Sequence, residues 1–171
     1  MTTRIDGRAR VLGDDVNTDY IVSSTRKKET IDENVLKRYL LEAVDPAFAA
    51  SVREGDVLVA GRNFGCGSAM EVAATVILAA GIRTVIAHSF ARTFYRNAIN
   101  NGLLPIECDT SEFQEGDAIT LELSDDRIVV ANGRTGKRQT SPAITGIVGD
   151  ILAAGGLVAY IRQEGRFVQK H

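Results

Sequence analysis

The sequence predicts an α/β fold in which a βαβαβ core is joined to an antiparallel, β-rich layer. Two observations support this. Between residues 56 and 107, short apolar runs alternate with segments that have helical spacing, whereas from residue 117 the apolar residues recur at every second position. The chain has 171 residues, of which 44% are hydrophobic and 25% charged. That is enough for one domain with a sizeable core, and we expect residues 1–171 to form a single domain.

The first part of the chain mixes strand and helix patterns. Residues 8–13 (RARVLG) read as a strand, followed by a turn rich in Asp and Asn, and residues 20–23 (YIVS) are expected to form a short second strand. Residues 31–44 have apolar side chains at helical spacing after a possible N-cap at Asp32. Residues 45–52 add a helical turn with Pro46 at its first position.

The middle of the chain alternates regularly. We expect strands at 56–61, 84–89 and 103–107, with helices at 69–80 and 90–101 between them, the second ended by Gly102. This order places parallel strands side by side, with right-handed crossovers.

The spacing of apolar residues changes in the last third of the chain. Residues 117–123 and 126–131 alternate with period two and predict an antiparallel hairpin, and 132–137 (NGRTGK) predict another turn. A terminal helix is expected over 150–165, broken at the glycine pair 155–156.

Net charge, apolar segments and cysteine spacing exclude several classes of function. The net charge of −2 gives no basic surplus for nucleic acid or an acidic membrane surface. No apolar segment has the length that spans a bilayer, and the first residues lack a signal pattern, so we expect a cytoplasmic protein. Cys66 and Cys108 lie far apart without a CxxC pattern, so we expect this chain to bind no metal or iron–sulfur cluster by itself.

The segment NFGCGSAMEV, residues 63–72, joins a predicted strand to a predicted helix. A helix N-terminus offers unpaired backbone N–H groups, and Gly65 and Gly67 allow a ligand to approach them, which suits a small anion such as a carboxylate. The spacing matches neither GxxxxGK[ST] nor GxGxxG. Ser68 either caps the helix or points at the anion and takes part in proton transfer, a role that needs groups stabilising its alkoxide.

Four stretches in order carry a resemblance: GDDVNTDYI (13–21), VLVAGRNFGCGS (57–68), AGIRTVIAHSFARTFYRNAINNGLLPIE (80–107) and DILAAGGLVAYI (150–161). Together they resemble the small subunit of 3-isopropylmalate dehydratase. The wider family includes the small subunits of homoaconitase and 2,3-dimethylmalate dehydratase and the swivel domain of aconitase. The resemblance covers nearly the whole chain.

The resemblance implies a β/β/α swivel domain that closes over an active site held mostly by a large subunit, which carries a [4Fe-4S] cluster. The pair would be a hydro-lyase or isomerase for a 2-hydroxy di- or tricarboxylic acid, and 3-isopropylmalate dehydration in leucine biosynthesis is the expected activity. Ser68 matches the family serine that removes a proton. Homoaconitase, 2,3-dimethylmalate dehydratase and a non-catalytic carboxylate-binding module stay open, as does a homo-oligomer of the isolated chain.

The chain also departs from the family motif G-S-S-R-E-H, since residues 67–72 read GSAMEV. A Met at position 70 cannot replace the bidentate carboxylate contact of an arginine. Another cation is therefore expected to hold the substrate, with Arg26 preferred over Lys27. The expected substrate-binding residues are Arg26, Lys27, Thr18, Asp19, Gly67, Ala69 and Met70.

Three further side chains are expected to have structural roles and not to contact the substrate or take part in catalysis. Arg92 and Arg96 are expected on one helix face, paired with acidic partners within the chain. His88, at the end of a predicted strand, is expected to be a hydrogen-bonded structural histidine.

Overall fold

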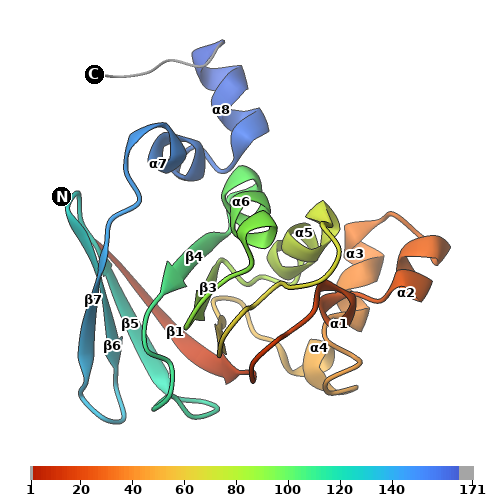
Figure 1. The fold of residues 1–171 in the computed structure, drawn as a ribbon, viewed down its shortest axis with the longest axis horizontal. Helices are drawn as coiled ribbons and strands as arrows, with labels where there is room; N and C mark the ends of the chain where they lie inside the picture. Colours follow the sequence, from red (N-terminus) through yellow and green to blue (C-terminus); the bar gives the residue numbers. More distant parts are fainter. Residues whose placement is uncertain (1, 166–171) are drawn as a thin grey trace.

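The structure, a computed structural model, describes residues 2–165 and is built on one seven-stranded sheet (Figure 1). The strand order is β4-β3-β2-β1-β5-β6-β7, so β1 is central. It pairs in parallel with β2 and antiparallel with β5. The strands are β1 Thr3–Val11, β2 Val57–Ala60, β3 Thr84–Ala87, β4 Leu104–Glu107, β5 Ala118–Leu123, β6 Arg127–Asn132 and β7 Arg138–Pro142.

The two halves of the sheet match the two predicted layers. Strands β1 to β4 are parallel, and β5 to β7 form an antiparallel meander. The helices are α1 Thr18–Ile21, α2 Ser24–Glu29, α3 Glu33–Leu36, η1 Lys37–Tyr39, α4 Phe48–Ser51, α5 Glu71–Ala79, α6 Arg92–Asn101, α7 Gly146–Ala153 and α8 Leu157–Glu164. The α/β class, the βαβαβ core and the antiparallel layer are confirmed.

Both faces of the parallel half are covered, so β2 and β3 are buried at every position, and Thr84 is their one polar residue. Leu58 and Ala60 point toward α5 and α6 and join one core cluster. Val57 and Val59 point the other way and pack against the antiparallel strands, which curl over that face. A third small cluster joins α6 to α7 and α8, which lie beyond α6 in Figure 1.

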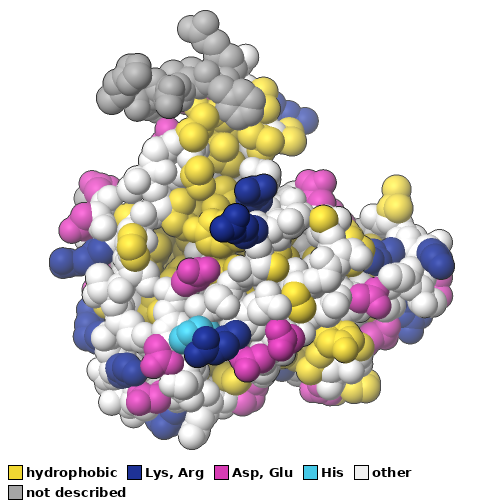
Figure 2. Space-filling model, viewed as in Figure 1, with side chains coloured by type: hydrophobic (Ala, Val, Ile, Leu, Met, Phe, Trp, Pro, Cys, Tyr) yellow, Lys and Arg dark blue, Asp and Glu magenta, His cyan; other side chains and the backbone are white. Residues whose placement is uncertain are grey.

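The two edge strands of the curled sheet, β4 and β7, are joined by side chains. The Ser141 hydroxyl donates a 2.7 Å hydrogen bond to the carbonyl of Glu107. The Gln139 amide exchanges two hydrogen bonds, of 2.6 and 2.9 Å, with the backbone of Asp109. A cavity of about 460 Å³, the β4–β7 cavity, lies between these edges and α6. Figure 2 shows apolar side chains gathered there, between α6 and the β7–α7 connection.

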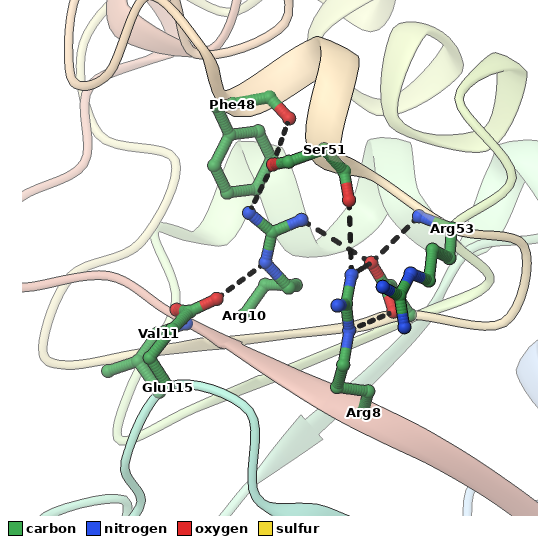
Figure 3. A network of polar contacts seen from close by, with 8 residues as sticks. Arg8, Arg10, Val11, Phe48, Ser51, Arg53 and Glu115 are labelled. Carbon is green, nitrogen blue, oxygen red and sulfur yellow. Dashed lines mark hydrogen bonds and ion pairs between the residues drawn. The ribbon is translucent and has the colours of Figure 1, made fainter.

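A buried charge network ties β1 to β2 and α4 (Figure 3). The guanidinium of Arg10 contacts Asp56 at 3.4 Å, Glu115 at 2.6 Å and the Ser51 hydroxyl at 2.7 Å. Arg8 adds a 2.8 Å ion pair to the same Asp56 carboxylate. Arg10 and Asp56 are both buried. Every charge in the network has a partner, which is the condition for burying it at acceptable cost.

Two local predictions were wrong. Residues 20–23 do not form a strand, because the Asn17 side chain accepts from the backbone N–H of Asp19 and starts α1. The 31–44 helix begins after the predicted cap, Asp32, but it breaks after η1. At the break Leu41 lies in the left-handed region, and both Leu40 and Leu41 are buried.

The later predictions are confirmed. Helix α6 ends at Gly102 in the left-handed region, and the terminal helix is broken at the predicted glycine pair. Within the part of the chain that the structure describes, no helix combines the length and the apolar character needed to cross a membrane.

Candidate functional site

Ser68 lies on a double loop formed where β1 and β2 end. After these strands, residues 12–18 and 61–68 continue side by side and exchange backbone hydrogen bonds, including Gly65 N–H to Val16 at 2.8 Å and Thr18 N–H to Cys66 at 2.8 Å. The two segments can be followed in Figure 1 between β1 and α1 and between β2 and α5. This pairing gives the loop a fixed shape although it has no regular secondary structure.

Side chains of residues 12–18 contact residues 61–68 and fix their conformation. The buried hydroxyl of Thr18 donates a 2.9 Å hydrogen bond to the carbonyl of Ser68. Gly67 has φ +92°, and a Cβ placed on it would lie 2.5 Å from Oδ1 of Asn17, so a larger residue does not fit. Thr18 and Gly67, which were predicted to bind substrate, thus shape the loop that carries Ser68.

Ser68 does not cap helix α5, because that helix begins at Glu71 with Met70 in the cap position. Gly65 and Gly67, both at positive φ, turn the chain before the helix starts. Ser68 and its neighbours Gly67 and Ala69 are exposed. Its hydroxyl has no hydrogen-bond partner among residues 2–165.

Backbone donors surround this free hydroxyl. The N–H groups of residues 67–70 make no hydrogen bond to any other residue that the structure describes. They immediately precede α5, whose dipole places partial positive charge at the same end. An anion could be held here by backbone groups alone.

Asp19 connects the site to the next helix. Its carboxylate accepts hydrogen bonds of 2.6 Å from the Ser24 hydroxyl and 2.8 Å from the Ser24 backbone. These bonds, with the nearby charge of Lys27, lower the pKa of Asp19, which stays ionised at neutral pH. Asp19 thus orients α2, the helix that carries both predicted cations.

The two cations are placed differently. Arg26 stacks on the ring of Tyr39, 3.8 Å from its centroid, and its guanidinium pairs with Glu42 at 2.9 Å and Glu29 at 3.4 Å. Lys27 instead places its Nζ against the Sδ of Met70. Lys27 forms no ion pair within the described chain, so it is the cation beside the Ser68 loop that stays available.

A cavity of about 410 Å³, here the Lys27 cavity, opens beside this ammonium group. Its lining is mixed: three apolar side chains, Ile31, Leu36 and Val72, lie among the polar or charged residues Lys27, Thr30, Glu33, Glu71, Thr75 and Asn101. Val72 stands where the family motif has a histidine, and it makes this wall apolar.

Three predictions for other residues were wrong. Arg92 and Arg96 are exposed and have no acidic partner among residues 2–165; both line the β4–β7 cavity. His88 is exposed, and its imidazole makes no hydrogen bond within the described chain, so it is not a buried structural histidine. Asn17, which shapes the loop at Gly67, was missed as a site residue although an Asn before Thr-Asp is a common capping signal.

Comparison with known proteins identifies the family. The model of the aconitase C-terminal domain matches residues 13–111, which include both segments of the double loop. The chain belongs to the aconitase C-terminal domain family.

Two relatives and a solved structure within this family show how far the likeness extends. The methanogen homoaconitase small subunit of Methanocaldococcus jannaschii is 45% identical over 93% of this chain and 92% of its own length. The 3-isopropylmalate dehydratase small subunit 1 of Methanopyrus kandleri is 45% identical, with 94% of each chain covered. The crystal structure of M. jannaschii 3-isopropylmalate dehydratase (leuD) superposes with a TM-score of 0.88 at 43% identity, covering 95% and 96% of the two chains.

This member of the aconitase family offers no cluster site in the part that the structure describes. Residues 2–165 contain no group of three or more His, Cys, Asp and Glu side chains placed to hold a metal ion. Both cysteines are free, Cys66 in the double loop and Cys108 after β4. Burial and the neighbouring Asp109 raise the pKa of the Cys108 thiol to about 11, which disfavours the thiolate that a cluster needs.

Proposed function

We propose that this chain is the small subunit of an aconitase-type hydro-lyase and that it supplies the base Ser68 to an active site shared with a large subunit. The observation that supports this best is the exposed, unpaired Ser68 hydroxyl, held on a fixed double loop beside free backbone N–H groups. A helix-capping hydroxyl would instead accept a hydrogen bond from a backbone N–H at the start of α5, and Ser68 does not.

In the proposed reaction, Ser68 accepts a proton from a carbon of the substrate next to the one that loses its hydroxyl. The C–H bond breaks, the proton moves to Oγ of the Ser68 alkoxide, and the C–H electron pair forms the C=C bond while the C–O bond of the neighbouring carbon breaks and its hydroxyl leaves with the bonding pair. An alcohol is a poor base, so its alkoxide must be stabilised by nearby donors and cations. The N–H groups of residues 67–70 and the Lys27 ammonium group supply part of that stabilisation.

The substrate carboxylate is proposed to lie between the N-terminal end of α5 and Lys27. Lys27 replaces Arg26 as the preferred partner, because the Arg26 guanidinium is already paired with Glu42. Thr18 and Asp19 position the loop and α2, while Gly67, Ala69 and Met70 form the surface that the substrate approaches.

The [4Fe-4S] cluster is proposed to belong to the large subunit, and the complex to be cytoplasmic. The preferred substrate is 3-isopropylmalate, because Ile31, Leu36 and Val72 in the Lys27 cavity can contact an alkyl group, whereas Glu33 and Glu71 would repel a further carboxylate. Homoaconitate and 2,3-dimethylmalate are the rival substrates, and the homoaconitase small subunit among the relatives supports keeping the first of them in the test.

The test is co-expression with a cluster-bearing large subunit of an aconitase-type hydro-lyase, anaerobic cluster reconstitution, and turnover of 3-isopropylmalate, homoaconitate and 2,3-dimethylmalate. We expect a co-purifying complex that turns over 3-isopropylmalate fastest. Turnover by the large subunit alone at the same rate would contradict the proposal. Carboxylate binding by the complex without turnover of any of these acids would instead favour the non-catalytic binding module.

A further inference from the structure

The β4–β7 cavity shares no lining residue with the Ser68 loop or the Lys27 cavity. Its floor and walls are apolar and come from distant parts of the chain: Phe90 before α6, Pro105 and Ile106 on β4, Ile128 on β6 and Ile144 after β7. A volume of about 460 Å³ is in the range of cavities that hold small molecules.

Three charged groups line this apolar cavity without pairing. Arg92 and Arg96 lie one helical turn apart on α6, and neither forms an ion pair within residues 2–165. Glu107 at the end of β4 likewise has no ion pair in the described chain, although its charge, together with burial, raises the pKa of Tyr95 on α6. In Figure 2, Lys or Arg side chains lie over α6 and an acidic side chain lies near the end of β4, on either side of the apolar area.

The strand edges argue against a peptide as the occupant. An added strand needs free N–H and C=O groups along an edge. Pro105 on β4 and Pro142 on β7 both line the cavity, and each removes a backbone donor from its edge. The Glu107 carbonyl is already used by Ser141. The cavity therefore favours a compact ligand over an extended strand.

We propose that the β4–β7 cavity binds a free α-amino acid with an apolar side chain. The arrangement matches each part of that ligand: the guanidinium groups of Arg92 and Arg96 take the α-carboxylate, the Glu107 carboxylate takes the α-ammonium group, and the apolar floor takes the side chain. A simple fatty acid would leave Glu107 unpaired beside its carboxylate. A polar amino acid would bury a group without a partner.

Binding to the full-length chain by isothermal titration calorimetry tests this without reference to catalysis, so it does not depend on the proposed function. The probe is L-leucine, with 4-methylpentanoate lacking the ammonium group and 3-methylbutylamine lacking the carboxylate. We expect saturable L-leucine binding at least tenfold tighter than either analogue. Arg96→Gln and Glu107→Gln should each weaken it at least tenfold, whereas Arg53→Gln, outside the cavity, should not, and circular dichroism should show all variants folded.

Three outcomes would overturn the proposal. The first is the absence of saturable L-leucine binding to the folded chain. The second is equal binding of 4-methylpentanoate with no effect of Glu107→Gln, which would make the cavity a general carboxylate site. The third is L-leucine binding that is unchanged in both Arg96→Gln and Glu107→Gln, which would place the binding site outside this cavity.

Discussion

The hydroxyl of Thr18 donates a 2.9 Å hydrogen bond to the backbone carbonyl of Ser68, 50 positions away in the chain. This bond fixes the residue proposed as the base relative to the end of β1. Thr18 is buried, so its hydroxyl has no ready alternative partner in water. Because Thr18 is buried and its hydroxyl is bonded to the Ser68 carbonyl, it is a positioning residue for Ser68.

Thr18→Val keeps the shape of the side chain and removes the donor. We expect the free energy of unfolding to fall by about 0.5–1.5 kcal/mol, the net worth of a hydrogen bond. The kcat of the assembled enzyme should fall roughly tenfold to a hundredfold, since small displacements of a reacting group are costly. Denaturant unfolding and steady-state kinetics measure the two effects. Thr120→Val, which removes an exposed surface bond to Asp6, is the matched control and should leave kcat unchanged.

Lys27→Ala should raise KM and lower kcat/KM by about 1.5–3 kcal/mol, the worth of a hydrogen bond to a charged group. Lys28→Ala changes an exposed neighbour on the same helix and should have little effect. Arg26→Ala should lower stability through the loss of the Glu42 pair and the Tyr39 contact, with a smaller effect on KM. A large KM effect for Arg26→Ala and none for Lys27→Ala would reverse the assignment.

A double substitution tests whether Met70 faces the same carboxylate. Met70→Arg should partly restore kcat/KM in the Lys27→Ala background, because the new guanidinium would occupy the place of the ammonium group that contacts Met70. In the protein that keeps Lys27, Met70→Arg places two cations together and should raise kcat/KM less. If Met70→Arg only destabilises both proteins, Met70 has a packing role alone.

Asp56→Asn should destabilise the fold by about 1–3 kcal/mol, because it removes the carboxylate that Arg8 and Arg10 share, although Arg10 keeps its ion pair with Glu115. Burial alone would raise the pKa of Asp56, but hydrogen bonds from Arg8, from the Arg53 backbone and from Arg10 lower it overall. With a lowered folded-state pKa, its stabilisation is complete at neutral pH and is lost as pH falls below about 4. Denaturant unfolding at pH 7 and pH 3.5 should show this loss in the wild type and a smaller one in Asp56→Asn.

Cys108 should resist alkylation. Its pKa is raised to about 11 by burial and by Asp109, so almost no thiolate is present at pH 8. Mass spectrometry after iodoacetamide treatment of the folded chain should show little modification at Cys108 and full modification after unfolding in urea. Rapid labelling of Cys108 in the folded chain would show that this region opens readily.

The sequence predicts the parallel core because its signals are local. Val57 to Ala60 are apolar throughout, as a strand buried on both faces requires, and Gly102 marks the end of α6 by its own conformation. Residues 20–23 failed for the opposite reason. Their β-branched and aromatic side chains favour a strand, but the cap at Asn17 and burial of Ile21 favour a helical turn.

The sequence suggests which residues form the candidate site but not how they pair. The order of glycines and the motif around Ser68 indicate the loop. The choice between Arg26 and Lys27 depends instead on Glu42 and Tyr39, which lie 16 and 13 positions after Arg26 at no regular spacing. The sequence also could not show whether Arg92 and Arg96 have acidic partners. In residues 2–165 they form no ion pair, although Glu107 lines the same cavity.

The most direct test of the central claim is the kcat of the assembled enzyme with Ser68→Ala. If Ser68 is the base, kcat should fall by several orders of magnitude while KM changes much less, because the lost interaction exists only in the transition state. Complex formation and the unfolding midpoint should stay near those of the wild type, since the Ser68 hydroxyl is exposed and has no partner among residues 2–165. Turnover within a fewfold of the wild type would contradict the assignment of Ser68 as the base.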